Sequence, residues 1–197
     1  MPTSPTRAYL ILHGWQNHRP TPHWQHHLTT DLRAPGHEVH HPQLPDPDTP
    51  DLDTWLAELT RHLGELKADD RTVICHSLAC VLWLHALHRD LVTVQPDRVL
   101  LVAPPAPEIL ARYPEVSAFA PPPLAPERLH RTRLVASAGD PYCPGGAAKV
   151  YGEPLRIRTD VLPASEAHLD LPAGYGSWPS MLEWCLDPAE EHTFVPR

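Results

Sequence analysis

The sequence predicts an α/β protein, a three-layer Rossmann-like fold in which a mostly parallel sheet of about six strands is flanked by helices. Short apolar runs alternate along the chain with segments of helical periodicity, as in doubly wound sheets. Most of these runs are almost continuous Val, Leu and Ile, which is typical of parallel strands buried on both faces. The strands are predicted at Ala8–His13, Glu38–His41, Thr72–Cys75, Arg98–Ala103, Arg133–Ser137 and Leu155–Val161.

Helices are predicted between the strands. Thr21 is a suitable N-cap for the first helix, and Asp51 and Asp53 mark the start of the second. The third is apolar around most of its circumference, which indicates a buried helix. The predicted segments are Pro22–Leu32, Leu52–Leu66, Leu78–Leu91, Gly145–Tyr151 and Ser180–Leu186.

The length of 197 residues suits one compact domain spanning 1–197. Prolines gather between the apolar runs, and the excursion 104–126 is too long and proline-rich for a plain connection, so we expect it to form a small cap over the carboxyl edge of the sheet. No apolar run is long enough to cross a membrane, and the N-terminus has no signal-peptide pattern.

Charge and cysteine content narrow the class of protein further. The formal net charge is −8 and the sequence has no basic stripe, so a nucleic-acid binder is not expected. The four cysteines form no C-x-x-C pair. We therefore expect free thiols and a cytoplasmic location.

A candidate nucleophile stands where a buried strand runs straight into a helix. Ser77 occupies this junction within the pattern Cys75-x-Ser77-x-Ala79. The tight turn of a nucleophile elbow, usually G-x-S-x-G, needs small residues on both sides of the serine, and Cys and Ala are the next smallest choices after Gly. Taken alone, Ser77 could equally be a helix N-cap.

Two later strand ends supply the partners that a nucleophilic serine needs. Asp140 follows the fifth predicted strand and His168 follows the sixth. The order Ser, acid, His is the one found in hydrolases with this type of elbow. Because ligand sites of open α/β sheets lie at the carboxyl ends of the strands, these three residues are predicted to converge as a catalytic triad.

Other residues compete for two of these roles. Asp160 and Glu166 are alternative acids. The alternative histidines are His13, His18 and His76. His13 is expected to have a structural role under the following loop, and His76 should point away from the nucleophile because it directly precedes it in the chain.

The backbone amides of Trp15 and Leu78 are the predicted oxyanion hole. Leu78 follows the nucleophile at a helix N-terminus, where the helix dipole favours negative charge. Trp15 lies in the loop His13-Gly14-Trp15 after the first strand. Trp15, Tyr142 and Trp178 are predicted to contact substrate.

The sequence resembles the small serine hydrolases of the retinoblastoma-binding-protein/YdeN-like family, a branch of the α/β-hydrolases, from about Tyr9 to Trp184. The resemblance implies the α/β-hydrolase fold, a Ser-Asp-His triad and hydrolase activity. This sequence differs from the family at Ala79 and Ala167, where the family usually has Gly. It also lacks the L-x-C-x-E segment of a retinoblastoma-protein ligand. The matching segments are His13-Gly14-Trp15-Gln16, His23-Trp24, Ser77 with Cys80, Asp140-Pro141-Tyr142-Cys143, His168 and Gly174-Tyr175-Gly176-Ser177-Trp178-Pro179.

Two histidine clusters, at residues 23–27 and 37–41, could suggest metal ligands. Neither contains an H-E-x-x-H pattern or a nearby cysteine, so no metal site is predicted. No cofactor is expected either.

Taken together, the candidate triad and oxyanion hole predict a carboxylesterase-like serine hydrolase for a small acyl substrate, with thioesterase and amidase activity left open. The alternative is a catalytically impaired scaffold that acts as a protein-interaction module with an unknown partner.

Overall fold

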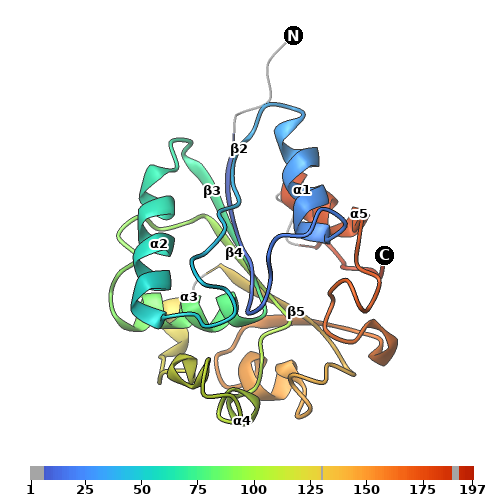
Figure 1. Cartoon of the computed structure of the whole chain (residues 1–197). Coiled ribbons are helices and arrows are strands. Elements are labelled where there is room, and N and C mark those ends of the chain that lie inside the picture. The colour runs from blue at the N-terminus through green and yellow to red at the C-terminus, as the bar shows by residue number, and fades with distance from the viewer. Residues whose placement is uncertain (1–6, 130, 188–190) are drawn as a thin grey trace.

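Six strands form one parallel sheet in the computed structural model, which describes residues 7–129, 131–187 and 191–197 (Figure 1). The strand order is β2-β1-β3-β4-β5-β6, and every neighbouring pair is parallel. The predicted fold class is confirmed. The strands are β1 (Arg7–Leu12), β2 (Glu38–His40), β3 (Asp70–His76), β4 (Arg98–Val102), β5 (Thr132–Ser137) and β6 (Arg158–Leu162).

The N-terminal residues 1–6, in which we expect no signal peptide, lie outside the described residues. Within the part of the chain that is described, no helix combines the length and the apolar composition that crossing a bilayer requires.

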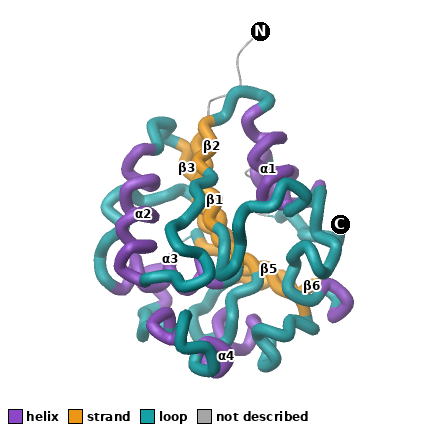
Figure 2. The backbone as a smooth tube through the Cα atoms, viewed as in Figure 1, coloured by secondary structure: helices purple, strands orange, loops and turns teal. Residues whose placement is uncertain are grey.

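Helices cover both faces of the sheet (Figures 1 and 2). α2 (Leu52–Glu65) and α3 (Leu78–His88) lie on one face, and α1 (Trp24–Arg33) and α5 (Pro179–Leu186) lie on the other. Side chains of β1 alternate between two cores: Leu10 and Leu12 pack in the core that includes α2 and α3, whereas Tyr9 and Ile11 pack in the core that includes α1 and α5. This burial on both faces explains the continuous apolar runs of the sequence.

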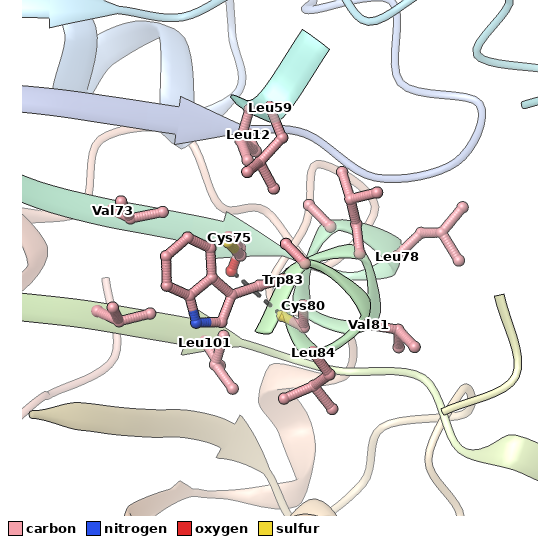
Figure 3. Close-up of a cluster of buried hydrophobic side chains, with 14 of the residues drawn as sticks. Leu12, Leu59, Val73, Cys75, Leu78, Cys80, Val81, Trp83, Leu84 and Leu101 are labelled. Carbon is pink, nitrogen blue, oxygen red and sulfur yellow. Dashed lines mark hydrogen bonds between the residues drawn. The ribbon is translucent and has the colours of Figure 1, made fainter. Parts of the chain in front are cut away.

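Helix α3 is buried almost throughout, as its apolar circumference predicted (Figure 3). Every residue from 78 to 87 is buried. The Cys80 thiol donates hydrogen bonds to the carbonyl oxygens of Cys75 and Val102, both at 3.3 Å. The first turn of the helix is therefore fixed against β3 and β4, directly behind Ser77.

Two helix ends differ from the prediction by more than one residue. α1 begins at Trp24 because the side chain of His23, and not that of Thr21, accepts the hydrogen bond of the Gln25 amide. α3 ends at His88, three residues earlier than predicted, because Asp90 adopts a left-handed φ of 56°. The Leu91 amide then donates to the Ala86 carbonyl, as in a Schellman motif.

The predicted start of the sixth strand is wrong by three residues. Arg156 has a left-handed φ of 52°, which breaks the extended backbone, and the Ile157 amide turns back to the Gly152 carbonyl. β6 therefore begins at Arg158. The helix predicted at 145–151 is a short π-helical turn, η3 (Ala148–Gly152).

The proline-rich excursion is anchored in the core on the α2 and α3 side. It contains α4 (Pro107–Leu110) and the 3-10 turn η1 (Ser117–Phe119), and a second such turn, η2 (Pro126–Leu129), follows it. Phe119 is fully buried, and its ring lies 5.5 Å from that of Trp55 in an edge-to-face contact. A short turn η4 (Ala164–Glu166) follows β6.

Several histidines are buried next to the carboxyl edge of the sheet. Burial disfavours the charged imidazolium and lowers the pKa of His13 to about 4, that of His23 to about 4 and that of His41 to about 3. Burial also holds the pKa of His76 well below its usual value. These side chains are neutral in the folded protein near neutral pH.

Stability should therefore fall as the pH is lowered from about 6.5 toward 4. In this window the unfolded chain binds protons at histidines near pH 6.5, whereas the folded chain binds them only near pH 4. Each such histidine contributes a slope of about 1.4 kcal/mol per pH unit to the free energy of unfolding. Urea denaturation at pH 7, 6 and 5 measures this slope.

Replacing one buried histidine should reduce by about one the number of protons that the chain takes up on unfolding, and the slope should fall in proportion. His41→Gln is the suitable variant, and His88→Gln, at an exposed position, is its control and should leave the slope unchanged. A free energy of unfolding that stays constant between pH 7 and 5 would contradict the burial of these neutral imidazoles.

Candidate active site

The site is built around the junction of β3 and α3. Ser77 has a left-handed φ of 56° with ψ of −123°, a strained conformation for a residue with a side chain. Its amide donates to the Val102 carbonyl at 2.9 Å. Cys75 and Ala79, which stand where the elbow pattern usually has glycine, are both fully buried, so these small residues fit the turn.

A continuous hydrogen-bond chain joins the three residues predicted to form a triad. The Ser77 hydroxyl lies 2.9 Å from His168 Nε2. His168 Nδ1 lies 2.9 Å from Asp140 Oδ2 and 3.0 Å from Oδ1. Because a carboxylate only accepts, the proton between them is carried by Nδ1, and Nε2 is left to accept the Ser77 proton.

The competing acids are occupied elsewhere. Asp160 accepts two hydrogen bonds from the Arg133 guanidinium, at 2.6 and 2.9 Å. Glu166 accepts from the Tyr175 hydroxyl at 2.8 Å and from Arg197 at 3.0 Å. These contacts hold the pKa of Glu166 below its usual value, chiefly through the Tyr175 hydrogen bond. Asp140 is the acid that the structure brings to His168.

The competing histidines also have other contacts. His18 is exposed and lies 3.0 Å from Asp48. His13 Nδ1 donates to the Gly14 carbonyl at 2.9 Å, while its Nε2 accepts from the Leu44 amide at 2.8 Å. The ring of His13 thus holds the loop that carries Trp15, which is the structural role expected of it.

Three consecutive backbone carbonyls position His168, a feature that the sequence did not reveal. The carbonyls of residues 167–169 each accept a hydrogen bond from a different element. The Ser137 hydroxyl donates to the first, His76 Nε2 to the second at 3.2 Å, and Trp24 Nε1 to the third at 3.0 Å. The ring of His76 therefore supports the loop of His168.

Ser77 opens into a cavity of about 480 Å³, a volume within the usual range for small-molecule sites. Both residues whose amides were predicted to form the oxyanion hole line this cavity. So does Tyr142, whose ring lies 4.5 Å from that of His168. The residues that line it include Trp15, Ser77, Leu78, Ile109, Leu110, Tyr113, Val116, Tyr142, His168 and Asp170.

Trp178 does not line the cavity, so the prediction that it contacts substrate does not fit its position. Its ring is buried in the core on the α1 and α5 side, 4.8 Å from the ring of Tyr175 and 5.6 Å from that of Trp24. Its Nε1 donates to the Val195 carbonyl at 2.8 Å. Trp178 is the N-cap residue of α5 without a capping bond from its side chain, and the indole packs against Tyr175 in the loop that follows His168.

The excursion 104–126 supplies one apolar wall that sequence analysis did not assign residue by residue. Ile109, Leu110, Tyr113 and Val116 line the cavity. Leu110, Tyr113 and Val116 recur at every third residue, and this spacing is the signal that could have revealed the wall, since it matches the successive turns of the backbone here.

His23 is a second feature that sequence analysis missed. Its Nδ1 accepts from the Gln25 amide at 3.2 Å, so in the neutral ring the proton lies on Nε2. This Nε2 is buried and has no hydrogen-bond partner among the described residues, and His23 is one of the residues that line the cavity.

The described residues contain a group of potential metal ligands, but it lies outside the cavity. It consists of His40, His62 and Glu65, none of which lines the cavity.

The parallel sheet, the strained serine at the strand-to-helix junction and the hydrogen-bonded Ser, His and Asp side chains define the class of α/β-hydrolases. A family model described as serine hydrolase matches residues 9–185. The chain belongs to this serine hydrolase family, and the resemblance noted in the sequence is confirmed. Comparison with curated proteins gave no match.

Solved structures share the fold at low sequence identity. The ydeN gene product of B. subtilis is 21% identical with a TM-score of 0.74, over 92% of this chain and 97% of that one. One of two metagenome-derived lipolytic enzymes, LipS and LipT, is 15% identical with a TM-score of 0.63, over 93% of each chain. A methylesterase from Arabidopsis is 17% identical with a TM-score of 0.60, over 92% of this chain and 98% of that one.

Gly14→Ala should sharply reduce activity while leaving the protein folded. A methyl group at this position would lie 2.7 Å from Ser77 Cβ and 3.1 Å from its Oγ, so the serine or the Trp15 loop has to move. A displacement of about 1 Å at a reacting group can lower the rate on the order of 10²-fold. Hydrolysis of a chromogenic short-chain ester measures the loss.

Gly64→Ala is the matched control for this variant. Gly64 lies in α2, and a Cβ there meets nothing within 4 Å, so activity should stay unchanged. Full activity in Gly14→Ala would show that the close approach of the loop to Ser77 is unimportant.

Proposed function

We propose that this serine hydrolase cleaves small esters through a triad of Ser77, His168 and Asp140 and an acyl-enzyme intermediate. The observation that carries the proposal is the unbroken hydrogen-bond chain from Asp140 to the Ser77 hydroxyl at the wall of a cavity. Such a chain activates a serine that is a weak nucleophile on its own.

In the first half of the reaction, Ser77 Oγ attacks the ester carbonyl carbon. His168 Nε2 takes the hydroxyl proton and then donates it to the leaving alcohol oxygen as the carbon–oxygen bond breaks. Asp140 keeps the His168 proton on Nδ1 and stabilises the imidazolium that forms. Because Asp140 is nearly fully buried, its charge acts on the imidazole with little screening by water.

The tetrahedral intermediate places a negative charge on the former carbonyl oxygen. We assign the oxyanion hole to the backbone amides of Leu78 and Trp15, which belong to residues that line the cavity beside Ser77. Leu78 is the first residue of α3, so its amide also carries the positive end of the helix dipole.

In the second half, water releases the acyl group. His168 Nε2 takes a proton from water, the resulting hydroxide attacks the acyl carbon, and the proton returns to Ser77 Oγ as that bond breaks. The reaction requires only side chains and amides of this chain.

The cavity favours a small, largely apolar acyl group without a carboxylate. Its wall of Ile109, Leu110 and Val116 is apolar, and Asp170 would repel a negatively charged substrate. An ester is preferred to a thioester or an amide because solved structures with this fold include lipolytic enzymes and a methylesterase.

Two further expectations remain part of the proposal. The excursion 104–126 acts as a small cap on a single domain, since five of its residues line the cavity. A cytoplasmic location fits the four free and buried cysteines, Cys75, Cys80, Cys143 and Cys185.

The alternative function is a catalytically impaired scaffold that binds another protein. The substitutions Cys75 and Ala79 in the elbow favour it, because this turn usually has glycine at both positions. Both side chains fit the turn and the hydrogen-bond chain is intact, so we prefer the enzyme.

Labelling with a fluorophosphonate probe at pH 7–8 tests the proposal without a known substrate. The probe should react at Ser77 alone, as shown by peptide mapping, and Ser77→Ala should lower esterase turnover by about 10⁶-fold because the triad acts as a unit. His168→Ala should abolish labelling. A folded protein that is not labelled would favour the interaction module.

Asp140→Asn should lower kcat by about 10⁴-fold, because the amide favours the wrong tautomer of His168. Asp160→Asn is the matched control. It weakens the ion pair with Arg133 and therefore stability, but the rate per folded molecule should change little. If steady-state kinetics showed the larger loss for Asp160→Asn, the acid would be misassigned.

A further inference from the structure

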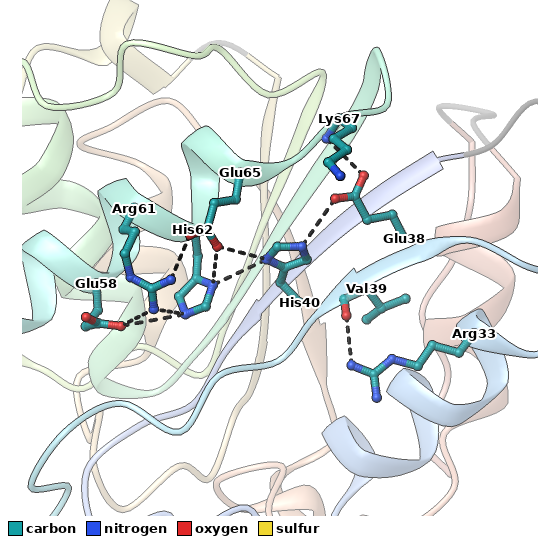
Figure 4. Close-up of polar contacts among 9 residues, drawn as sticks. All are labelled: Arg33, Glu38, Val39, His40, Glu58, Arg61, His62, Glu65 and Lys67. Carbon is teal, nitrogen blue, oxygen red and sulfur yellow. Dashed lines mark hydrogen bonds and ion pairs between the residues drawn. The ribbon is translucent and has the colours of Figure 1, made fainter.

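Two histidines and a glutamate meet on the face of the molecule where β2 approaches the last turn of α2 (Figure 4). His40 comes from β2, and His62 and Glu65 come from α2 at a spacing of three residues. Their ligand atoms lie close together: His40 Nδ1 is 3.3 Å from His62 Nδ1 and 3.9 Å from Glu65 Oε2, and His62 Nδ1 is 3.5 Å from Glu65 Oε2.

These distances suit a shared cation better than they suit direct hydrogen bonds. All three exceed the usual hydrogen-bond range of about 2.7–3.2 Å. Ligand atoms at about 2.0–2.1 Å from a tetrahedral zinc ion are about 3.3 Å from one another. The three atoms therefore approximate one face of a zinc coordination tetrahedron, and a fourth position is open to water beside the half-exposed Glu65.

The surrounding contacts already orient His40 for metal binding. Its Nε2 lies 3.2 Å from Glu38 Oε1, which leaves the Nδ1 lone pair directed at the cluster. Glu38 in turn accepts hydrogen bonds from the backbone amides of Lys67, at 2.9 Å, and Ala68, at 3.3 Å. A carboxylate behind a histidine ligand is a common outer contact of zinc sites, where it fixes the tautomer and raises the basicity of the ligand.

The other contacts of Glu65 and His62 are compatible with metal binding through Glu65 Oε2 and His62 Nδ1. Arg61 occupies Glu65 Oε1 at 2.9 Å, so Oε2 faces the histidines. Metal binding at Nδ1 places the His62 proton on Nε2, 3.6 Å from Glu58, and Arg61, now 2.8 Å from that nitrogen, has to turn aside. Only its Nη2 lies at this nitrogen, so the bond from Nη1 to Glu65 Oε1 can be kept when Nη2 moves.

We propose that His40, His62 and Glu65 form a zinc-binding site, separate from the esterase cavity, that joins strand β2 to the last turn of α2. The donor set of two imidazoles and one carboxylate is one that zinc accepts. β2 is a three-residue strand at the edge of the sheet, so a metal crosslink to α2 adds a contact at the end of the sheet where pairing is shortest. The site is structural in character, since none of its residues lines the cavity.

No metal site is predicted from the sequence, because the histidine clusters 23–27 and 37–41 are separate local patterns that lack further ligands. His62 and Glu65, which complete the site, lie more than twenty residues away from His40 and reach it only after α2 packs beside β2.

Calorimetric titration of untagged, chelator-treated protein with Zn²⁺ tests the proposal. We expect one binding site per chain and a rise in Tm of about 5 °C or more at saturating zinc, reversed by EDTA. His40→Gln, His62→Gln and Glu65→Gln should each weaken binding at least about 10-fold and remove most of the Tm rise. Glu65→Gln keeps the assay interpretable if a histidine variant folds poorly, because residue 65 is exposed.

His88→Gln is the matched control for zinc bound to exposed histidines, and it should bind as the unchanged protein does. Absence of a zinc-dependent rise in Tm would overturn the proposal. So would equal zinc affinity in Glu65→Gln and the unchanged protein, because the ion would then be bound elsewhere. Neither the zinc affinity nor the Tm depends on esterase activity, so the result is independent of the proposed function.

Discussion

The backbone turn at Ser77 is the constraint on which the rest of the site depends. β3 ends and α3 begins on either side of this one residue, whose left-handed φ is strained for serine. Burial of β3 and of nearly all of α3 holds the turn, and the Cys80 thiol fixes the first helical turn to two strands. One junction thereby sets both the position of the hydroxyl and the direction of the helix amides.

Much of this arrangement could be predicted from sequence because it follows from topology. Continuous apolar runs identify parallel strands, and parallel strands place their carboxyl ends at one edge of the sheet. Residues in the loops after those ends, such as Asp140 and His168, are therefore placed at the same edge of the sheet as Ser77. The order of the residues and one strained turn were therefore sufficient to predict which side chains meet.

The errors concern contacts that local sequence does not determine. Trp178 is as large and aromatic as a substrate-contacting residue, but its place in the core depends on packing against α1, far away in the sequence. The cap of α1 is His23 and not Thr21, because a chain entering from a turn can start its helix at several positions. The cluster of His40 with His62 likewise requires a strand and a helix from separate segments.

The carbonyl contacts of residues 167–169 have a consequence for how the molecule opens. They tie the loop of His168 to Ser137 at the end of β5, to His76 at the end of β3 and to Trp24 at the start of α1. Detaching this loop leaves buried donors from three elements without partners at once, which is costly. Amide hydrogens of the loop should therefore exchange with solvent together with those of the central sheet, and the loop and the sheet form one cooperative unit. A motion that opens the cavity is then confined to its other wall, which the excursion 104–126 supplies.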